Sequence, residues 1–282
     1  MRRIGVHVSI AGGVHLSLER AKELGCSTMQ IFSHNPRGWA FKDIDKEEAS
    51  QFIRLSEESD ISSFIHSSYL INLASPDDET RRKSIELLSY ELRMADLLGI
   101  DHVVLHPGKM VGQELNVAVE KTKDALLKVY EKAESRSGIL IENTAGQKGD
   151  ISSSLAMIAD VIEGAPSGLV KGICFDTCHG FAAGYDIAQD EGLSRLEQEI
   201  KKYLSPLKVE LIHLNDAKQG LSSNIDRHEH IGMGAIGIEG FRRFLSVPLF
   251  KNIPLVLETP KKEEDDDTRN LDLVRGILNE IG

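Results

Sequence analysis

The sequence predicts an α/β protein, a single (β/α)8 (TIM) barrel that spans residues 1–282. The length is close to the ~250 residues typical of such a barrel. Eight short apolar runs alternate with longer stretches whose apolar residues recur at helical spacing, and acids or histidines stand where most of those runs end. This alternation, with mostly short connections, favours one closed parallel barrel over two domains.

The expected elements follow one another along nearly the whole chain. Short apolar runs predict strands over residues 4–8, 28–32, 63–65, 102–105, 139–141, 172–175, 209–212 and 254–257. Helices are expected over residues 17–24, 46–59, 77–98, 113–136, 151–163, 191–204, 239–244 and 267–281. Ser75 and Pro76 suit the start of the third helix as its cap and first turn. Residues 215–237 form the longest irregular stretch, and such loops tend to carry function.

Composition predicts a globular protein of a reducing compartment. With 41% hydrophobic and 27% charged residues, the chain has ample material for a core. Cys26, Cys174 and Cys178 are too few for a disulfide scaffold, which favours the cytoplasm. Strand-like sequence from Ile4 leaves no room for a targeting peptide, and no apolar run approaches the ~18 residues of a membrane span. We therefore expect a cytoplasmic protein, monomeric by default, with no membrane partner.

The net charge of −11 would ordinarily argue against nucleic acid as a partner. Four of the acids, however, belong to the candidate metal site, where three divalent ions would bring about +6 and leave about −5. The acidic run over residues 263–267 can also lie far from any binding face. Overall charge therefore does not decide whether the protein binds nucleic acid.

Nine acids and histidines form a candidate metal site. Six of them stand at the ends of expected strands, and all strand C-termini of a parallel barrel meet at one mouth. Burying so many imidazoles and carboxylates together would be costly without a cation, because few donors would be left to pair them. The nine residues are His66, His106, Glu142, Asp176, His179, His213, Asp226, His228 and Glu258.

The types of ligand narrow the choice of metal. Five histidines among nine candidates suit zinc, with manganese or iron as the alternatives. Magnesium and calcium would be expected to show mostly oxygen ligands. Cys174 and Cys178 are four residues apart, unlike a zinc knuckle, so we expect them to be buried packing residues. The site is therefore predicted to hold zinc.

The segments that carry these residues also carry a family resemblance. They are HVSIAGG (7–13), NPRGW (35–39), HSSYLINLA (66–74), LHPG (105–108), IENTAGQ (141–147), CFDTCH (174–179), HLNDAK (213–218), DRHEHIGMGAIG (226–237) and LETP (257–260). In these strings, and in their order over nearly the whole chain, the sequence resembles the endonuclease IV family of zinc-dependent apurinic/apyrimidinic (AP) endonucleases.

The resemblance implies three zinc ions per chain, deoxyribonuclease IV activity in base excision repair, and catalysis by Glu142 and Glu258. The implied ligands are His66, His106 and Glu142 for one ion, Glu142, Asp176, His213 and Glu258 for the second, and His179, Asp226 and His228 for the third. Such ions would generate a metal-bound hydroxide near neutral pH and bear the charge of the phosphate. The family cuts the phosphodiester 5′ to an abasic site, leaving a 3′-hydroxyl and a 5′-deoxyribose phosphate, and trims blocked 3′ ends.

The resemblance also implies how a missing base would be recognised in double-stranded DNA. A duplex that lacks one base has lost stacking there, so wedging side chains into the gap and extruding the sugar costs less than at an intact step. Arg37, Tyr69 and Leu70 match the family positions for such contacts, and Gln147 in the NTAGQ loop is expected at the DNA face. The alternative reading is that Tyr69 and Leu70 pack on the barrel and that Arg37 is a solvated loop cation.

Two rival functions remain open at this point. Related barrels that isomerise or epimerise sugars hold one or two metals with a set like Glu142, Asp176, His213 and Glu258. That function would leave most of the other candidate ligands unexplained. The other rival is a non-catalytic binder of damaged DNA in which the metals only support the fold.

Overall fold

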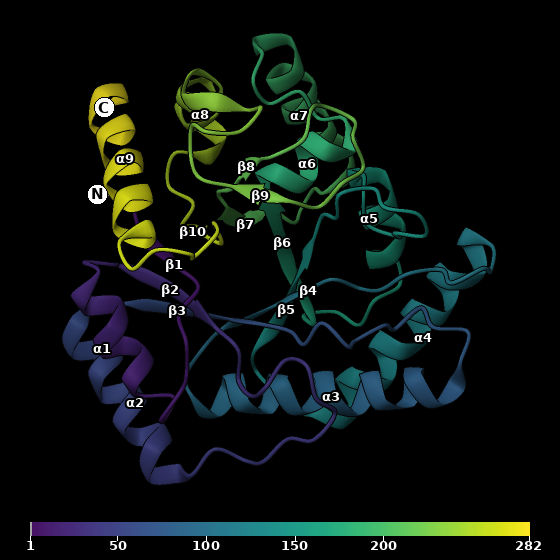
Figure 1. Cartoon of the computed structure of the whole chain (residues 1–282). Helices are drawn as coiled ribbons and strands as arrows, with labels where there is room; N and C mark the ends of the chain where they lie inside the picture. Colours follow the sequence, from purple (N-terminus) through teal and green to yellow (C-terminus); the bar gives the residue numbers. More distant parts are fainter. Residues whose placement is uncertain (1) are drawn as a thin grey trace.

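Eight parallel strands form the central sheet of the computed structural model, which describes residues 2–282 (Figure 1). Their spatial order is β1-β10-β7-β6-β5-β4-β3-β2. They are β1 (Ile4–Val6), β2 (Thr28–Ile31), β3 (Ser62–His66), β4 (His102–Leu105), β5 (Gly138–Glu142), β6 (Val170–Asp176), β7 (Val209–His213) and β10 (Leu255–Leu257). All eight predicted strands are present, with ends within two residues of the predicted ones.

The sheet closes into a barrel between its first two strands. His7 and Gln30 form a parallel bridge, and the backbone N–H of Val8 donates to the carbonyl of Gln30 at 2.7 Å. Gly5 makes this approach possible, because a Cβ there would lie 1.6 Å from the carbonyl oxygen of Thr28. The predicted (β/α)8 architecture is therefore confirmed.

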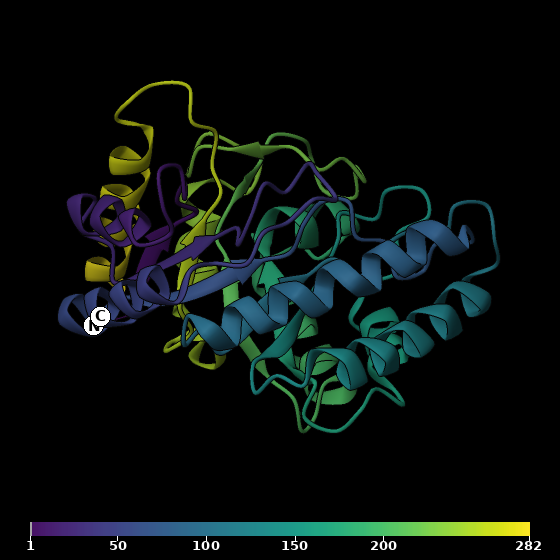
Figure 2. The ribbon, with the colours of Figure 1, turned by 90° about the horizontal axis from the view of Figure 1, so that it is seen from below.

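Helices surround the barrel (Figures 1 and 2). They are α1 (Leu16–Glu23), α2 (Lys46–Ser59), α3 (Asp78–Leu97), α4 (Leu115–Ala133), α5 (Leu155–Ile162), α7 (Asp190–Tyr203), α8 (Gly237–Ser246) and α9 (Asp266–Ile281). The sequence did not predict α6 (Thr177–Ala183), the 3-10 turn η1 (Pro248–Phe250), or the hairpin of β8 (Asp216–Ala217) and β9 (His228–Glu229). No helix within residues 2–282 is both long and apolar enough to cross a bilayer.

Three helices, α3, α4 and α5, start later than the sequence suggested, and capping side chains explain the starts of α3 and α5. The cap of α3 is Asp77 rather than Ser75, because the Asp77 carboxylate accepts from the N–H of Thr80 at 2.7 Å. Helix α5 begins at Leu155, since Ser154 caps it by accepting from the N–H of Met157 at 3.2 Å. In both cases a capping side chain inside the predicted range ends the preceding loop.

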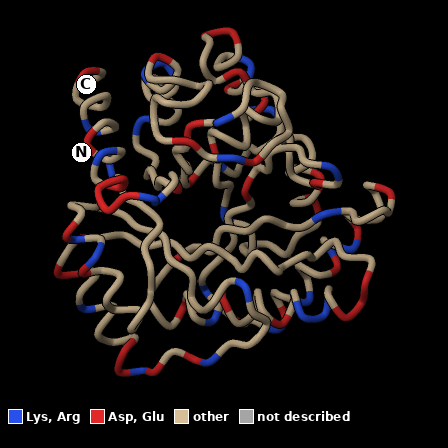
Figure 3. The backbone as a smooth tube through the Cα atoms, viewed as in Figure 1, with Lys and Arg blue, Asp and Glu red and all other residues tan. Residues whose placement is uncertain are grey.

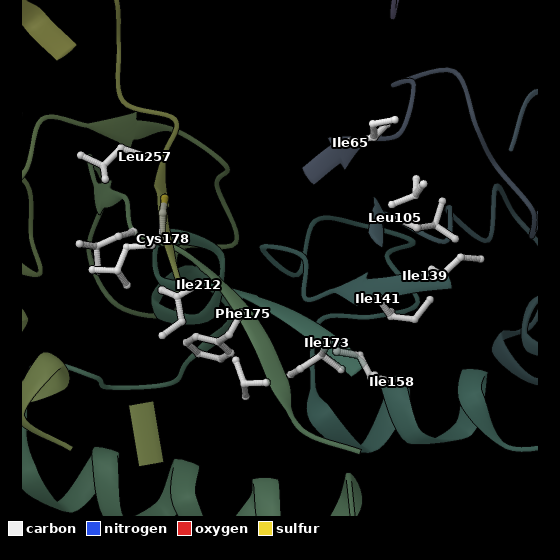
Figure 4. Close-up of a cluster of buried hydrophobic side chains, with 14 of the residues drawn as sticks. Ile65, Leu105, Ile139, Ile141, Ile158, Ile173, Phe175, Cys178, Ile212 and Leu257 are labelled. Carbon is white, nitrogen blue, oxygen red and sulfur yellow. The ribbon is translucent and has the colours of Figure 1, made fainter. Parts of the chain in front are cut away.

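Alternation along six strands places an apolar layer directly beneath the candidate metal ligands. Residues two apart on a strand share a face, so the residue two before each ligand also points into the barrel. These six residues form one buried cluster: Phe64, Val104, Leu140, Cys174, Leu211 and Val256. The residues between pack outward in the core shared with the helices: Ile65, Leu105, Ile141, Phe175, Ile212 and Leu257 (Figure 4). The candidate ligands therefore lie directly above a layer of buried apolar side chains.

Candidate metal centre

All nine predicted ligand residues meet at the C-terminal mouth of the barrel. Four are the last residues of β3, β5, β6 and β7, and two directly follow β4 and β10. The remaining three come from α6 and from the hairpin region. Six of the nine line a cavity of about 830 Å³: His66, His106, His179, Asp226, His228 and Glu258.

The candidate ligands form three neighbouring groups, two of which share Glu142. Within each group the ligand atoms all lie within 4.8 Å of one another. The groups are His66, His106 and Glu142; Glu142, Asp176, His213 and Glu258; and His179, Asp226 and His228. The structure thus brings together the three sets that the family resemblance implied.

Glu142 faces two groups at once. Its Oε2 lies 3.3 Å from His66 Nε2 and 3.0 Å from His106 Nε2. Its Oε1 lies 3.1 Å from Nδ1 of His213, in the second group. One carboxylate is therefore placed to bridge two neighbouring cations.

Two buried atoms that could bind a metal make no hydrogen bond of acceptable geometry to any described residue. One is Glu142 Oε2, and the other is His228 Nε2, which lies 3.6 Å from Asp176 Oδ2 and 3.7 Å from Asp226 Oδ1. Unpaired buried polar atoms are costly unless something else binds them. A mixed set of imidazole nitrogens and carboxylate oxygens suits a zinc-type divalent ion, so the donors fit the metal that the family implies.

Backbone carbonyls orient three of the histidines. Nδ1 of His66 lies 2.8 Å from the carbonyl of Ser67, Nδ1 of His179 lies 3.0 Å from that of Asn143, and Nδ1 of His228 lies 3.0 Å from that of Glu258. A carbonyl can only accept, so each Nδ1 carries the proton and each Nε2 is left to face the cluster. Metal-binding histidines are commonly held in this way.

Two asparagines that were not singled out from the sequence make hydrogen bonds to Asp176 and Glu258. Asn215 donates from Nδ2 to Asp176 Oδ2 at 2.6 Å, and its Oδ1 accepts from the N–H of Glu258 at 2.7 Å. Asn143 accepts from the N–H of Asp176 at 2.7 Å and donates to its carbonyl at 3.0 Å. Their only sequence signal was position, because each directly follows a strand-end residue or lies two beyond one.

The charges of the cluster stabilise one another. Burial alone would raise the pKa of Glu142, but the imidazoles of His106 and His213 outweigh it and hold that pKa well below its ordinary value. Burial would likewise raise the pKa of Asp226, and the imidazole of His179, with Nε2 3.2 Å from Asp226 Oδ1, brings it to about 2. These carboxylates are therefore ionised at neutral pH, as metal ligands must be.

Three nearby residues lie outside the predicted ligand set. Burial raises the pKa of the Cys174 and Cys178 thiols to about 12, so both remain protonated. Both lie within 4.8 Å of possible ligand atoms of neighbouring acids and histidines, and neither belongs to the ligand set that the family resemblance implies. His230, which the sequence analysis left out of the ligand set, is held at Nδ1 by Asn270 Nδ2 at 3.0 Å.

The four predicted DNA-contacting residues lie on loops around the mouth. Tyr69 is 66% exposed at the cavity rim, with its ring edge-on to Phe32 at 5.3 Å between centroids. Leu70 is half-buried and lines a second cavity of about 270 Å³. Arg37 is exposed. Gln147 is half-buried, and its Oε1 accepts from Lys109 Nζ at 2.7 Å.

A buried acid that the sequence analysis missed fastens the loop of Tyr69. Glu91 on α3 accepts from the N–H of Ser68 through Oε1 at 2.8 Å. The hydroxyl of Ser68 in turn donates to the carbonyl of Pro36 at 2.8 Å, which ties this loop to that of Arg37. Nothing in its helical surroundings in the sequence distinguished Glu91 from a solvent-facing acid.

Burial gives Glu91 a measurable pH dependence. Burial raises the pKa of Glu91 from 4.5 to about 8, and Nδ1 of His34 lies 3.7 Å from its Oε1. Between those pKa values the unfolded chain has lost the proton and the folded chain keeps it, so the free energy of unfolding falls as pH rises. The slope from one such group is at most about 1.4 kcal/mol per pH unit.

Replacing Glu91 with Gln should remove this fall in the free energy of unfolding, because glutamine does not titrate. It should keep an oxygen that accepts from the N–H of Ser68. The stability of Glu91→Gln relative to the wild type should therefore increase from pH 5 to pH 8, as measured by denaturant unfolding at matched metal content. The other titrating groups are shared by both proteins and cancel in the difference. A difference that stays flat over this range would show that Glu91 does not carry the shifted pKa.

The comparisons with known proteins agree on one family. The model of the family described as "Xylose isomerase-like TIM barrel" matches residues 18–277. The chain is 42% identical over 276 residues to "Probable endonuclease 4" of Methanoculleus marisnigri, covering 97% of this chain and 98% of that protein. It is 40% identical over 281 residues to the protein of the same name from Cenarchaeum symbiosum, covering 98% of this chain and 99% of that protein.

Solved structures separate the family from the wider fold. Endonuclease IV from Thermus thermophilus matches with a TM-score of 0.88 and 36% identity over 99% of both chains. A D-tagatose 3-epimerase-like protein matches with a TM-score of 0.73 at 16% identity over 99% of this chain and 98% of that one, a likeness of fold alone. The full-length relatives and the barrel agree with the resemblance read from the motifs, and the chain belongs to the endonuclease IV family.

Proposed function

We propose that this endonuclease IV family member repairs DNA by hydrolysing the phosphodiester bond 5′ to an abasic site in duplex DNA. The products would be a 3′-hydroxyl and a 5′-deoxyribose phosphate, and the same site would remove blocking groups from 3′ ends. Residues 1–282 would act as one catalytic domain with three zinc ions. A monomer suffices, because all nine candidate ligands come from one chain.

One observation supports this proposal most strongly: three neighbouring groups of candidate metal ligands, two of which share Glu142, lie at one mouth of the barrel. A sugar epimerase would employ the four donors Glu142, Asp176, His213 and Glu258 and leave the other five without a role. His228, whose Nε2 has no hydrogen-bond partner among the described residues, is one of those five. Residues outside the epimerase-type set are therefore also suited to bind a metal. A third group of metal ligands would hold an additional cation, and that cation would offset the negative charge of a phosphate.

The ions and the two glutamates of the site would have different roles in the reaction. When bound, the ions would neutralise charge on the phosphate and activate a water near neutral pH. Burial would raise the pKa of Glu258, but His213 outweighs it and holds that pKa well below its ordinary value. Glu258 and Glu142 are therefore ionised and can each accept a proton at a carboxylate oxygen.

The rim residues would select the damaged site. Tyr69 projects from the cavity edge above His66, with ring centroids 6.1 Å apart, and Arg37 lies on the adjoining loop. Insertion of an aromatic ring where a base is missing replaces lost stacking, whereas at an intact step it must break stacking. Lysine and arginine are interspersed with acids along the chain (Figure 3), so we expect local loop contacts to guide DNA despite the net charge of −11.

Incision of a defined duplex before and after chelation tests the proposal. The purified protein should cut a duplex with one abasic-site analogue at a single position, leave a 3′ end that a DNA polymerase extends, and release 3′-phosphoglycolate from a blocked primer. Prolonged chelation should remove both activities, slowly because the ions share ligands, and added zinc should restore them. The intact duplex of the same sequence is the control. Incision by metal-free protein at the original rate would reject the proposed mechanism.

A further inference from the structure

Two strands of the barrel carry no candidate ligand, and their inward residues contact the cluster instead. Strands β1 and β2 close the barrel, and the residues that meet at this seam are His7 and Gln30. Gln30 is a polar residue with 0% exposure, at the level of the apolar layer, where it pairs in register with Phe64. A buried amide in this position must find hydrogen-bond partners, and all of them are site residues.

Gln30 makes three hydrogen bonds. Its Oε1 lies 2.8 Å from Nε2 of His213, and its Nε2 donates to Glu258 Oε1 at 2.7 Å. The same Nε2 lies 3.1 Å from Nδ1 of His7. The opposite orientation of the amide would place its oxygen 2.7 Å from a carboxylate oxygen, which is repulsive. The orientation of Gln30 is therefore set by Glu258.

This orientation determines which nitrogen of His213 is free. Because Gln30 Oε1 can only accept, Nε2 of His213 carries a proton and donates it. Nδ1 is then the atom that faces the acids, 3.1 Å from Glu142 Oε1 and 3.4 Å from Glu258 Oε2. The pattern is the reverse of that in His66, His179 and His228, which present Nε2 and are held by backbone carbonyls. His213 is held by a side chain, which a substitution can remove.

We propose that Gln30 is a positioning residue that presents Nδ1 of His213 and Oε2 of Glu258 to the metal shared by Glu142, Asp176, His213 and Glu258. The inference rests on the proposed function, since it assumes that this group binds an ion. Gln30 is not itself a ligand, because both of its polar atoms are engaged by ligand residues. Loss of such a supporting partner typically lowers metal affinity about 10- to 100-fold.

The first test compares zinc affinity in Gln30→Met and in a matched control. Methionine keeps the length of the side chain and removes both polar atoms. In chelator competition on the zinc-loaded proteins, Gln30→Met should hold one ion about 10- to 100-fold more weakly than the wild type. Gln51→Met, on the half-buried face of α2, should leave every affinity unchanged. Wild-type affinity for all ions in Gln30→Met would overturn the inference.

A second measurement reads the histidine directly. In the zinc-loaded protein with 15N-labelled histidine, His213 should show a protonated, slowly exchanging Nε2, and Gln30→Met should lose that slow exchange. If Gln30→Met does not fold, Gln30→Glu keeps the oxygen that faces His213 but not the amide N–H that faces Glu258. It should retain the His213 signal and still bind one ion more weakly, and wild-type affinity would again overturn the inference.

The outcomes separate this inference from the proposed function. A wild-type protein that binds zinc and incises the abasic duplex, with Gln30→Met equal to it in zinc affinity and in the His213 signal, would overturn the role of Gln30 alone. A wild-type protein that binds no zinc would overturn both.

Discussion

Glu142→Gln should abolish incision of an abasic-site duplex while leaving the barrel folded. The amide has the shape of the carboxylate but only one oxygen. It therefore cannot supply one oxygen to the ligand group of His66 and His106 and another to the group of His213. It also removes the negative charge that the surrounding imidazoles stabilise and a base that could accept a proton. We expect a loss of at least about 1000-fold in kcat, or about 4 kcal/mol of transition-state stabilisation.

Rates on a labelled duplex, zinc content and circular dichroism together check this result. Glu163→Gln is the matched control, because Glu163 is an exposed residue at the end of α5 and should behave as the wild type. A Glu142→Gln protein that turns over at the wild-type rate would show that Glu142 neither bridges cations nor handles a proton.

Tyr69→Ala should weaken the preference for abasic over intact DNA while the zinc content stays at the wild-type level. The ring is 66% exposed and leans on Phe32, so its removal costs little packing and no metal ligand. Aromatic stacking on nucleic acid contributes about 1–3 kcal/mol per base, which corresponds to roughly a 5- to 150-fold loss of discrimination. Arg37→Ala should shift the preference in the same direction.

Competition between abasic and intact duplexes of the same sequence measures this preference. Tyr130→Ala offers a matched control, since Tyr130 is 47% exposed on α4, away from the mouth. Zinc loss in Tyr69→Ala, or an unchanged preference, would show that Tyr69 is a packing residue and not the wedge.

The fold and the six ligand residues at strand ends could be predicted because the signals are local, whereas the division into three ligand groups came from the family resemblance. Each strand that bears a ligand reads as an apolar inward residue, an apolar outward residue and then a polar residue at the mouth, as in Leu140, Ile141 and Glu142. The parallel topology then brings residues far apart in the chain to one place. Neither step needs knowledge of a particular tertiary contact.

The supporting residues could not be predicted because their roles depend on contacts distant in sequence. Gln30 reaches His213 across 183 positions and Glu258 across 228. In the sequence, Gln30 is only a polar residue within a short apolar run, and nothing there indicates which residues it contacts. Glu91 looks like one more acid on an amphipathic helix until the loop of Ser68 is folded over it. Helix α6 and the β8–β9 hairpin were missed because each is too short to show a periodic pattern.

Stepwise addition of zinc to the metal-free protein, followed by incision of the abasic duplex, tests the central claim most directly. Activity should be absent without metal and should reach its maximum at three equivalents of zinc per chain. Full activity with no zinc, or a maximum reached at one equivalent, would contradict the proposal that these nine side chains assemble a three-ion site for cutting DNA.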